Sequence, residues 1–208
     1  MAATPHRPNE VKLPEPLPNR LNLGCGQFPR AGFLNVDWDP TSPAEVHLNL
    51  NDPASYEVLP TGHFELVVMD HCLEHLSDVF GVIRAVHRLL ATGGRLEIRV
   101  PHFSRGMTHP EHCHGFDVTF PEYLNPSFRG GYIGVPFRLE SLRLDYMIGW
   151  DLKRPFLHPW QEQLLKCVNG VLTWLANVNP YACSRFWCYG VGGFEQIEFI
   201  LIKESPDG

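Results

Sequence analysis

The apolar residues of this chain gather into short runs separated by polar turns. Five of these runs predict strands, at residues 21–23, 33–37, 45–50, 64–70 and 95–101. The run at 64–70, FELVVMD, is continuously apolar, which is typical of a strand buried on both faces. Between the last two strands, apolar residues recur every three or four positions over 73–90 and predict a helix. Thr92-Gly93-Gly94 is expected to end it.

The second half of the chain has a different pattern. Residues 102–136 are rich in histidine, proline, glycine and aromatic residues without periodicity, which predicts a loop-rich insertion. Two more strands are expected at 137–150 and 195–203, with a helix over 159–178 between them. This alternation predicts an α/β fold, namely a Rossmann-like, seven-stranded, mostly parallel sheet with helices on both faces and a His- and aromatic-rich insertion.

Composition narrows the class of protein. The 208 residues are 44% hydrophobic and 19% charged, which indicates one globular domain over 20–208 after an extended, proline-rich arm at 1–19. The arm lacks the apolar core of a signal peptide, and no run reaches the ~20 apolar residues of a membrane span. A net charge of −6 argues against general nucleic-acid binding. Six cysteines without a CxxC pair predict reduced thiols and a cytoplasmic protein.

A glycine turn follows the first predicted strand. Gly24-Cys25-Gly26 comes directly after it, and Asp37 ends the second strand. Glycine at such a turn indicates a positive φ or a close backbone approach, and sheets of this type bind ligands beyond the carboxyl ends of their strands. Asp37 is placed to accept hydrogen bonds from a ribose diol. The dinucleotide pattern is absent, because Pro29 replaces its third glycine and Asp37 comes too early.

Four motifs in this order carry a resemblance to a known family. The stretches LNLGCG, GFLNVD, LEHL and LLATGGRLEIRVPH resemble class I S-adenosylmethionine-dependent methyltransferases, more narrowly bacterial small-molecule or glycan types, over about residues 20–103. The resemblance implies that the glycines pass beneath the methionine part of the cofactor and that Asp37 takes the ribose. The implied cofactor-binding residues are Asn22, Gly24, Cys25, Gly26, Asp37, Trp38, Asn49, Leu50, Asp70 and His71. Asn22 and Asn49 stand where many relatives carry acids.

Two groups of histidines are candidates for chemistry. His71, Glu74 and His75 are spaced to share one helical face, and His102, His109, His112 and His114 follow in the insertion. One histidine could act as a general base, with His71 and His112 as the candidates. A divalent metal could bind His71-x-x-Glu74-His75, which is similar to the E-x-x-E-H stretch of small-RNA and ubiquinone-pathway methyltransferases. The histidines could also have only structural roles, so no metal is assigned.

The helix predicted at 159–178 carries a strongly apolar face. It could cover a sheet edge, form the face of a homodimer, shape an acceptor pocket or rest on a membrane surface. Its single basic residue, Lys166, favours a packing or lid helix over a membrane-surface helix, which usually carries many basic residues.

These features predict an enzyme that moves a methyl group from S-adenosylmethionine to a hydroxyl or amine of a small-molecule or glycan acceptor. Two alternatives remain open at this point. One is a non-catalytic module that only binds S-adenosylmethionine, and the other is a metal-dependent enzyme, such as a hydrolase, that uses the histidine cluster.

Overall fold

The computed structural model describes residues 11–205, so residues 1–10 of the predicted arm lie outside the described part. The strands are β1 (Arg20–Leu23), β2 (Leu34–Asp37), β3 (Val46–His47), β4 (Phe64–Asp70), β5 (Leu90–Val100), β6 (Phe137–Asp145) and β7 (Gln196–Lys203). The α-helices are α1 (Val79–Leu89), α2 (Phe103–Gly106), α3 (Trp150–Lys153), α4 (Pro159–Val178) and α5 (Pro180–Arg185). The short 3-10 helices are η2 (Pro53–Val58), η3 (Leu73–His75), η4 (Phe120–Leu124), η5 (Arg154–Phe156) and η6 (Trp187–Tyr189).

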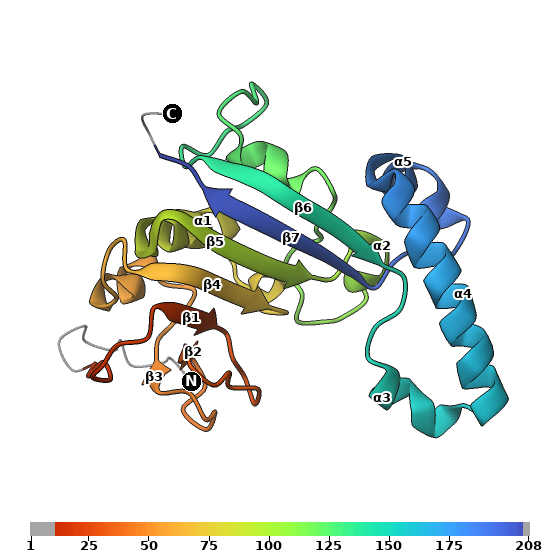
Figure 1. Ribbon diagram of the computed structural model, residues 1–208, viewed down its shortest axis with the longest axis horizontal. Helices are drawn as coiled ribbons and strands as arrows, with labels where there is room; N and C mark the ends of the chain where they lie inside the picture. Colours follow the sequence, from red (N-terminus) through yellow and green to blue (C-terminus); the bar gives the residue numbers. More distant parts are fainter. Residues whose placement is uncertain (1–10, 206–208) are drawn as a thin grey trace.

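The strands form one seven-stranded sheet in the order β3-β2-β1-β4-β5-β7-β6 (Figure 1). The first five strands pair in parallel, and β7 runs antiparallel to both β5 and β6. The predicted fold class is therefore confirmed. The third strand is much shorter than predicted, with only Val46 and His47 in the ladder.

The two faces of the sheet differ in character along β5. Leu96, Ile98 and Val100 are fully buried, in the same apolar core as α1. Arg95, Glu97 and Arg99 alternate with them and lie half-buried on the other face. Arg99 contacts Glu198 of β7 at 2.6 Å and Asp70 of β4 at 3.2 Å. This charged face is typical of a sheet open to water, which differs from the predicted cover of helices on both faces.

The first long helix begins later than the apolar spacing predicts. Residues 73–75 form only the η3 turn, and α1 starts at Val79, after Asp78 accepts a 2.8 Å hydrogen bond from the Gly81 amide. The N-cap interaction thus sets the start of the helix against the periodicity. The glycines at 93 and 94 also do not end this helix, because β5 already begins at Leu90.

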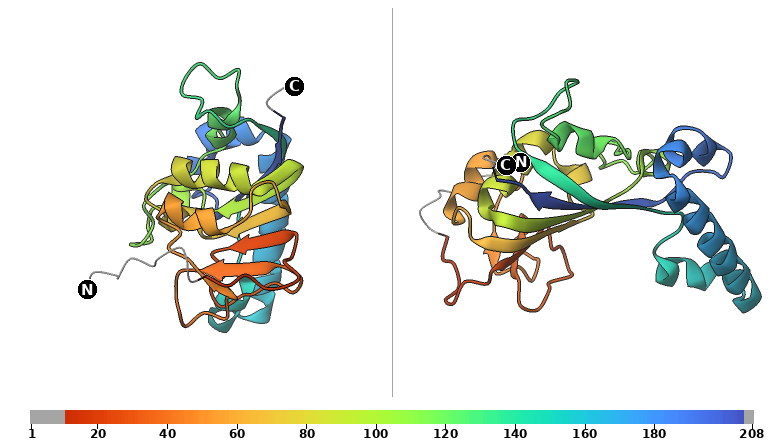
Figure 2. Two further views of the ribbon diagram at one scale, coloured as in Figure 1. Left: turned by 90° about the vertical axis from the view of Figure 1, so that its left-hand side faces the viewer. Right: turned by 45° about the horizontal axis from the view of Figure 1, so that its top comes forward.

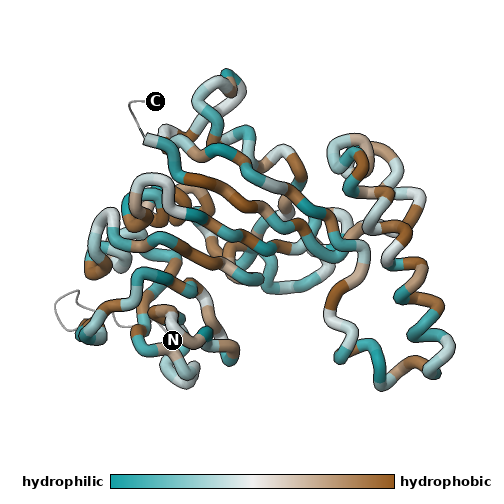
Figure 3. The backbone as a smooth tube through the Cα atoms, in the orientation of Figure 1, coloured by the Kyte–Doolittle hydropathy of each residue, from teal (hydrophilic) through white to brown (hydrophobic). Residues whose placement is uncertain are grey.

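The helix at 159–178 forms over the predicted residues. Helix α4 stands at one side of the molecule, beside the end of β6 rather than over a face of the sheet (Figures 1 and 2). Ala176 is the only fully buried residue of this helix, and most of its other apolar side chains are exposed, so its role as a lid or packing helix stays a prediction. Figure 3 shows brown, hydrophobic segments along its length. Among the described residues, no helix is long and apolar enough to span a bilayer.

Helix α4 is attached by polar residues instead. The Asn177 side chain accepts a hydrogen bond from the Leu144 amide at 2.9 Å and donates one to its carbonyl at 2.8 Å. Thr173 and Asn169 accept from the amides of Tyr146 and Met147. These residues are four apart, so they lie on one side of the helix, along the end of β6 and the chain that follows it.

The predicted insertion at 102–136 consists of loops with the short elements α2 and η4. It runs beside the carboxyl end of β5, where His102 and Phe116 form a short parallel bridge. Residues 11–19 lie against the core through Val11, Leu13 and Leu17, which are partly buried. The insertion therefore brings its histidines to the edge of the sheet at which the parallel strands end.

Candidate functional site

The glycine turn after β1 needs its glycines for two different reasons. Gly24 has φ +72°, and a Cβ at this position would collide with the Cys72 side chain behind it. Gly26 has φ +51° and faces open space, with nothing within 4 Å of a Cβ position. Gly24 is therefore required by packing and backbone conformation, and Gly26 leaves room for a ligand in front of the turn.

Asp37 holds this turn in place from the end of β2. Its carboxylate accepts hydrogen bonds from the Gly26 amide at 2.7 Å and from the Asp39 amide at 2.9 Å. The side chain is 5% exposed, so little of it is left to water. Each oxygen accepts one bond here and keeps a second acceptor position. Asp37 thus ties the loop after β1 to the loop after β2.

A pocket of about 610 Å³ opens at the carboxyl ends of β1, β2 and β4. It is lined by Gly24, Gly26, Gln27, Asp37, Trp38, Asp39, Asn49, Leu50, Asn51, His71, Cys72, His75, Leu76 and Glu111. Seven of the ten predicted cofactor-binding residues are in this lining. Of the other lining residues, His75 is predicted only as a candidate for chemistry, and Gln27, Asp39, Asn51 and Cys72 could have been found because each neighbours a predicted residue. Leu76 and Glu111 carry no such signal in the sequence.

The remaining three predicted residues do not line the pocket. Asn22 is buried and donates to the Asn35 side chain at 2.9 Å. Asp70 contacts Arg30 at 2.8 Å as well as Arg99. The Cys25 thiol is buried between the glycines, and burial followed by the nearby Asp37 charge raises its pKa to about 11. These side chains support the strands and the turn from behind.

His71 lies at the pocket with an unusual backbone, at φ +50°. Its Nδ1 is 3.2 Å from Glu74, and its Nε2 is 3.0 Å from the Gln196 side-chain oxygen. The Gln196 amide nitrogen donates to Asp145, which fixes its oxygen toward the imidazole. The hydrogen bond to Glu74 raises the pKa of His71, against the opposing effect of burial. Both ring nitrogens thus face oxygens, and this histidine is arranged as a hydrogen-bond donor.

His75 and His112 come together from different parts of the chain. Their ring centroids are 4.8 Å apart, and one potential ligand atom of each lies within 4.8 Å of one from Glu74. The Nδ1 of His75 lies 3.2 Å from the Glu111 carbonyl, and the Nδ1 of His112 lies 2.6 Å from the Gly106 carbonyl. The predicted grouping of His71, Glu74 and His75 on one α-helical face is wrong, because η3 is a 3-10 turn.

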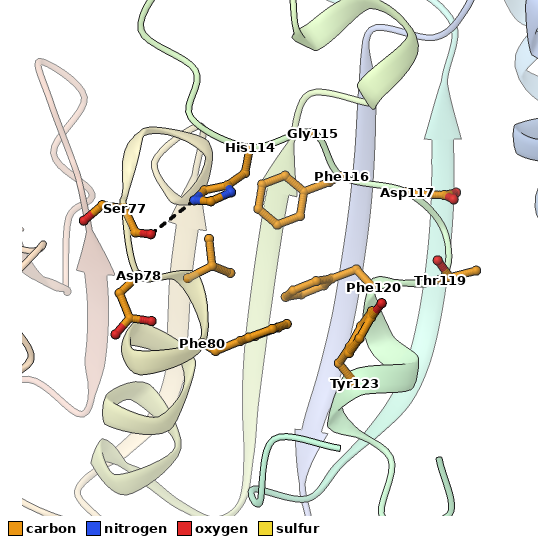
Figure 4. A pocket seen from close by; sticks show the side chains of 11 residues that line it. Ser77, Asp78, Phe80, His114, Gly115, Phe116, Asp117, Thr119, Phe120 and Tyr123 are labelled. Atoms are coloured by element: carbon orange, nitrogen blue, oxygen red, sulfur yellow. Dashed lines mark hydrogen bonds between the residues drawn. The ribbon is translucent and has the colours of Figure 1, made fainter. Parts of the chain in front are cut away.

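The other histidines of the insertion have separate surroundings. His102 is fully buried between the hydroxyls of Ser104 and Ser184, at 2.6 and 2.9 Å. Burial lowers its pKa to about 4, which makes it neutral near pH 7. His109 stacks on His112, with ring centroids 4.5 Å apart. The Nε2 of His114 contacts the Ser77 carbonyl at 3.3 Å (Figure 4).

Two further pockets adjoin this histidine loop. A polar pocket of about 390 Å³ is lined by Pro101, Ser104, Arg105, Gly106, Thr108, His109, His112 and Glu195. An aromatic pocket of about 440 Å³ lies at the start of α1, where the rings of Phe80, Phe116, Phe120 and Tyr123 face a common space (Figure 4). His112 therefore lines the polar pocket, whereas His75 lines the pocket at the glycine turn.

Comparison with known proteins agrees with this geometry. The model of a methyltransferase domain family matches residues 11–133. A SAM-dependent methyltransferase from Archaeoglobus fulgidus has a similar fold, with a TM-score of 0.56 and 14% identity over 90% of this chain and 86% of that one. The YcgJ protein from Bacillus subtilis is also similar in fold, with a TM-score of 0.50 and 15% identity over 89% of this chain and 92% of that one. No curated protein matches the chain.

The family match covers the glycine turn, Asp37, η3 and most of the histidine loop. It therefore includes the residues that line the pocket at the carboxyl ends of β1, β2 and β4. The chain belongs to this methyltransferase domain family.

Proposed function

We propose that the pocket at the glycine turn holds S-adenosylmethionine and that the enzyme methylates a hydroxyl or amine of a small-molecule or glycan acceptor in the polar pocket. The observation that supports this most directly is the contact between His75 and His112. One ring lines the first pocket, the other lines the second, and their centroids are 4.8 Å apart. Cofactor and acceptor would thus approach one another across this pair.

The residues of the first pocket suit the cofactor by size and chemistry. Asp37 has acceptor positions left for ribose hydroxyls, and Gly26 leaves space above the turn. Trp38 is 71% exposed beside Asp37, and Asn49 and Leu50 offer a polar and an apolar contact for the adenine. When bound, the cofactor supplies an electrophilic methyl group on a sulfonium. The chain has to hold it in line with the acceptor atom.

The lining of the polar pocket favours an uncharged, hydroxyl-rich acceptor. Ser104, Thr108 and His109 offer hydrogen bonds at its wall. The guanidinium of Arg105 is already bound to the Gly192 carbonyl at 2.7 Å and to Glu195 at 3.3 Å. Since this charge is neutralised within the protein, the pocket suits sugar hydroxyls better than an anionic group.

The acceptor loses a proton as the new bond to carbon forms, so a nitrogen with a free lone pair is needed nearby. His112 fits this role better than His71. In the neutral ring, its Nδ1 donates to the Gly106 carbonyl and its Nε2 keeps a free lone pair. Both nitrogens of His71 face oxygens, so this residue suits a positioning role at the pocket.

Calorimetric titration with S-adenosylmethionine and its demethylated product tests the cofactor pocket. We expect Asp37→Ala and Trp38→Ala to weaken both affinities about tenfold or more, which corresponds to about 1.4 kcal/mol each. Trp160→Ala is the matched control, because Trp160 is equally exposed but lies on α4. Unchanged affinity in both pocket variants would contradict this assignment.

Transfer of a labelled methyl group to a panel of hydroxyl and amine acceptors tests the reaction. We expect His112→Ala to lower kcat by about 10²- to 10⁴-fold while cofactor affinity is retained. An acceptor that is methylated equally well by the variant would remove His112 from proton transfer. Methylation of only flat apolar compounds would move the acceptor to the aromatic pocket.

A further inference from the structure

We propose that Glu74, His75 and His112 form a binding site for a divalent transition-metal ion, with Zn²⁺ as the best-fitting ion. The three residues come from the η3 turn and from the middle of the insertion, and one potential ligand atom of each lies within 4.8 Å of the others. This ion site goes beyond the proposed function, which assigns no metal, and its ion binding can be measured without cofactor or acceptor.

The first argument is an unpartnered buried carboxylate oxygen. Glu74 is 1% exposed, and its Oε1 contacts His71 whereas its Oε2 has no hydrogen-bond partner within the described residues. An unsatisfied buried polar atom of this kind is destabilising, and more so when it is charged. Protonation would not remove the cost, since the resulting hydroxyl would itself need an acceptor. A cation in contact with Oε2 would satisfy it.

The second argument is the orientation of the two imidazoles. Both rings direct Nδ1 toward a backbone carbonyl, of Glu111 for His75 and of Gly106 for His112. A carbonyl can only accept, so Nδ1 carries the proton in each neutral ring and Nε2 keeps its lone pair. Backbone carbonyls bound to the second nitrogen are the usual partners of metal-ligating histidines. His109 has the opposite arrangement, because its Nδ1 accepts from the Glu111 amide.

The backbone also locks the two segments together. The Cys113 amide donates to the Glu74 carbonyl at 2.8 Å, immediately beside His112. His71 holds Oε1 of Glu74, so the carboxylate is oriented from its other side. His71 therefore lies behind the site, in contrast to the sequence hypothesis of a metal held by His71, Glu74 and His75.

The ligand types decide the class of ion. Two imidazoles and one carboxylate suit zinc and related first-row ions, whereas magnesium and calcium prefer oxygen ligands alone. Zinc bonds of about 2.0–2.1 Å in a tetrahedron place ligand atoms roughly 3.4 Å apart. The three ligand atoms lie within 4.8 Å of one another, so small side-chain rotations would bring them to this spacing. Three protein ligands leave at least one position open, as in catalytic zinc sites.

The open position would lie between the two pockets described above, since His75 lines one and His112 the other. There an ion would lower the pKa of a bound hydroxyl and replace the His112 nitrogen as the group that eases loss of the proton. This consequence rests on the proposed function, but the existence of the ion site does not.

The test is competition for Zn²⁺ between chelator-treated protein and a fluorescent zinc chelator. We expect one equivalent to bind, and His75→Ala and His112→Ala each to weaken binding at least about 100-fold. Glu74→Gln keeps the buried shape, removes the charge and should weaken binding comparably. Cobalt substitution should give the visible absorption of a four- or five-coordinate ion in the wild type and lose it in these variants.

Matched controls come from the same loop. His114→Ala and Cys113→Ser leave the three ligands in place, so their zinc affinity should equal that of the wild type. No binding by the wild-type protein, or equal binding by the His75→Ala/His112→Ala double variant, would overturn the proposal. Failure of cofactor binding with an intact zinc site would instead count against the proposed function alone.

Discussion

The sheet and helix α4 place their apolar side chains in opposite ways. In the sheet, Leu96, Ile98 and Phe199 are fully buried, and charged residues take the opposite face. In α4, most apolar side chains meet solvent, with Trp174 67% exposed, while Asn177 makes hydrogen bonds to Leu144 of β6. The apolar content of a helix therefore says little about where it packs, because α4 leaves most of its apolar side chains exposed and is held by a row of hydrogen bonds together with Leu172 and Ala176.

The largest expected effect is on the free energy of unfolding, when one aromatic residue of the sheet and one of α4 are each replaced by alanine. Phe199→Ala should lower the free energy of unfolding by about 3–5 kcal/mol, because it leaves a cavity in the core. Trp174→Ala should change it by less than about 0.5 kcal/mol, as for other exposed residues. Urea denaturation of both variants measures the contrast. A large loss in Trp174→Ala would mean that α4 packs its apolar face in solution.

A smaller effect concerns His102, which joins the insertion to α5 through Ser184. Burial keeps its pKa at about 4 in the folded protein, below the ~6.5 of an unfolded chain, and the nearby Asp117 opposes this shift. The neutral ring therefore contributes stability that is complete above about pH 6.5 and is lost as the pH falls toward 4. The maximum loss is about 3 kcal/mol.

The measurement is the unfolding free energy between pH 7 and 4 for wild type and His102→Gln. His87 also has a pKa lowered to about 4 by burial, but it is present in both proteins and cancels in the difference. The wild type should lose more stability than the variant over this range. Parallel curves would show that His102 is solvated or charged in the folded state.

The smallest effect tests the attachment of α4. Asn177→Ala removes the hydrogen bonds to both backbone groups of Leu144, and should cost about 1–2 kcal/mol, confined to this helix. Hydrogen exchange at residues 144–147 and proteolysis within α4 should both accelerate. Gln163→Ala, at an exposed position of the same helix, is the control and should leave both rates unchanged. Unchanged exchange in Asn177→Ala would place the attachment elsewhere.

Local patterns carried the prediction of the sheet and much of the pocket. The run 64–70 matches β4 residue for residue, and the glycine turn with Asp37 locates the pocket at the end of β1 and β2. Each of these signals is local, because the residues that form a strand pattern, or a turn and the strand end beside it, lie close together in the sequence.

The parts of the site that the sequence does not indicate depend on contacts between residues far apart in the chain. His112 meets His75, and Gln196 meets His71 across 125 positions, which no spacing rule indicates. The sequence also gives no sign of the positive φ of His71, because non-glycine residues adopt such a φ only under constraint from their surroundings. The attachment of α4 could have been suspected from the spacing of Asn169, Thr173 and Asn177, since amides and hydroxyls so aligned can bind a neighbouring backbone.

The charged face of β5 also determines the register in which this strand pairs with its neighbours. Arg95, Glu97 and Arg99 alternate with Leu96, Ile98 and Val100, so a slip of one residue would exchange the two sets. Such a slip would bury three charges in the core and separate Arg99 from Asp70 and Glu198. A misregistered sheet would therefore be strongly destabilised, so the same alternation that turns one face of the sheet to water also fixes the register of β5 against β4 and β7.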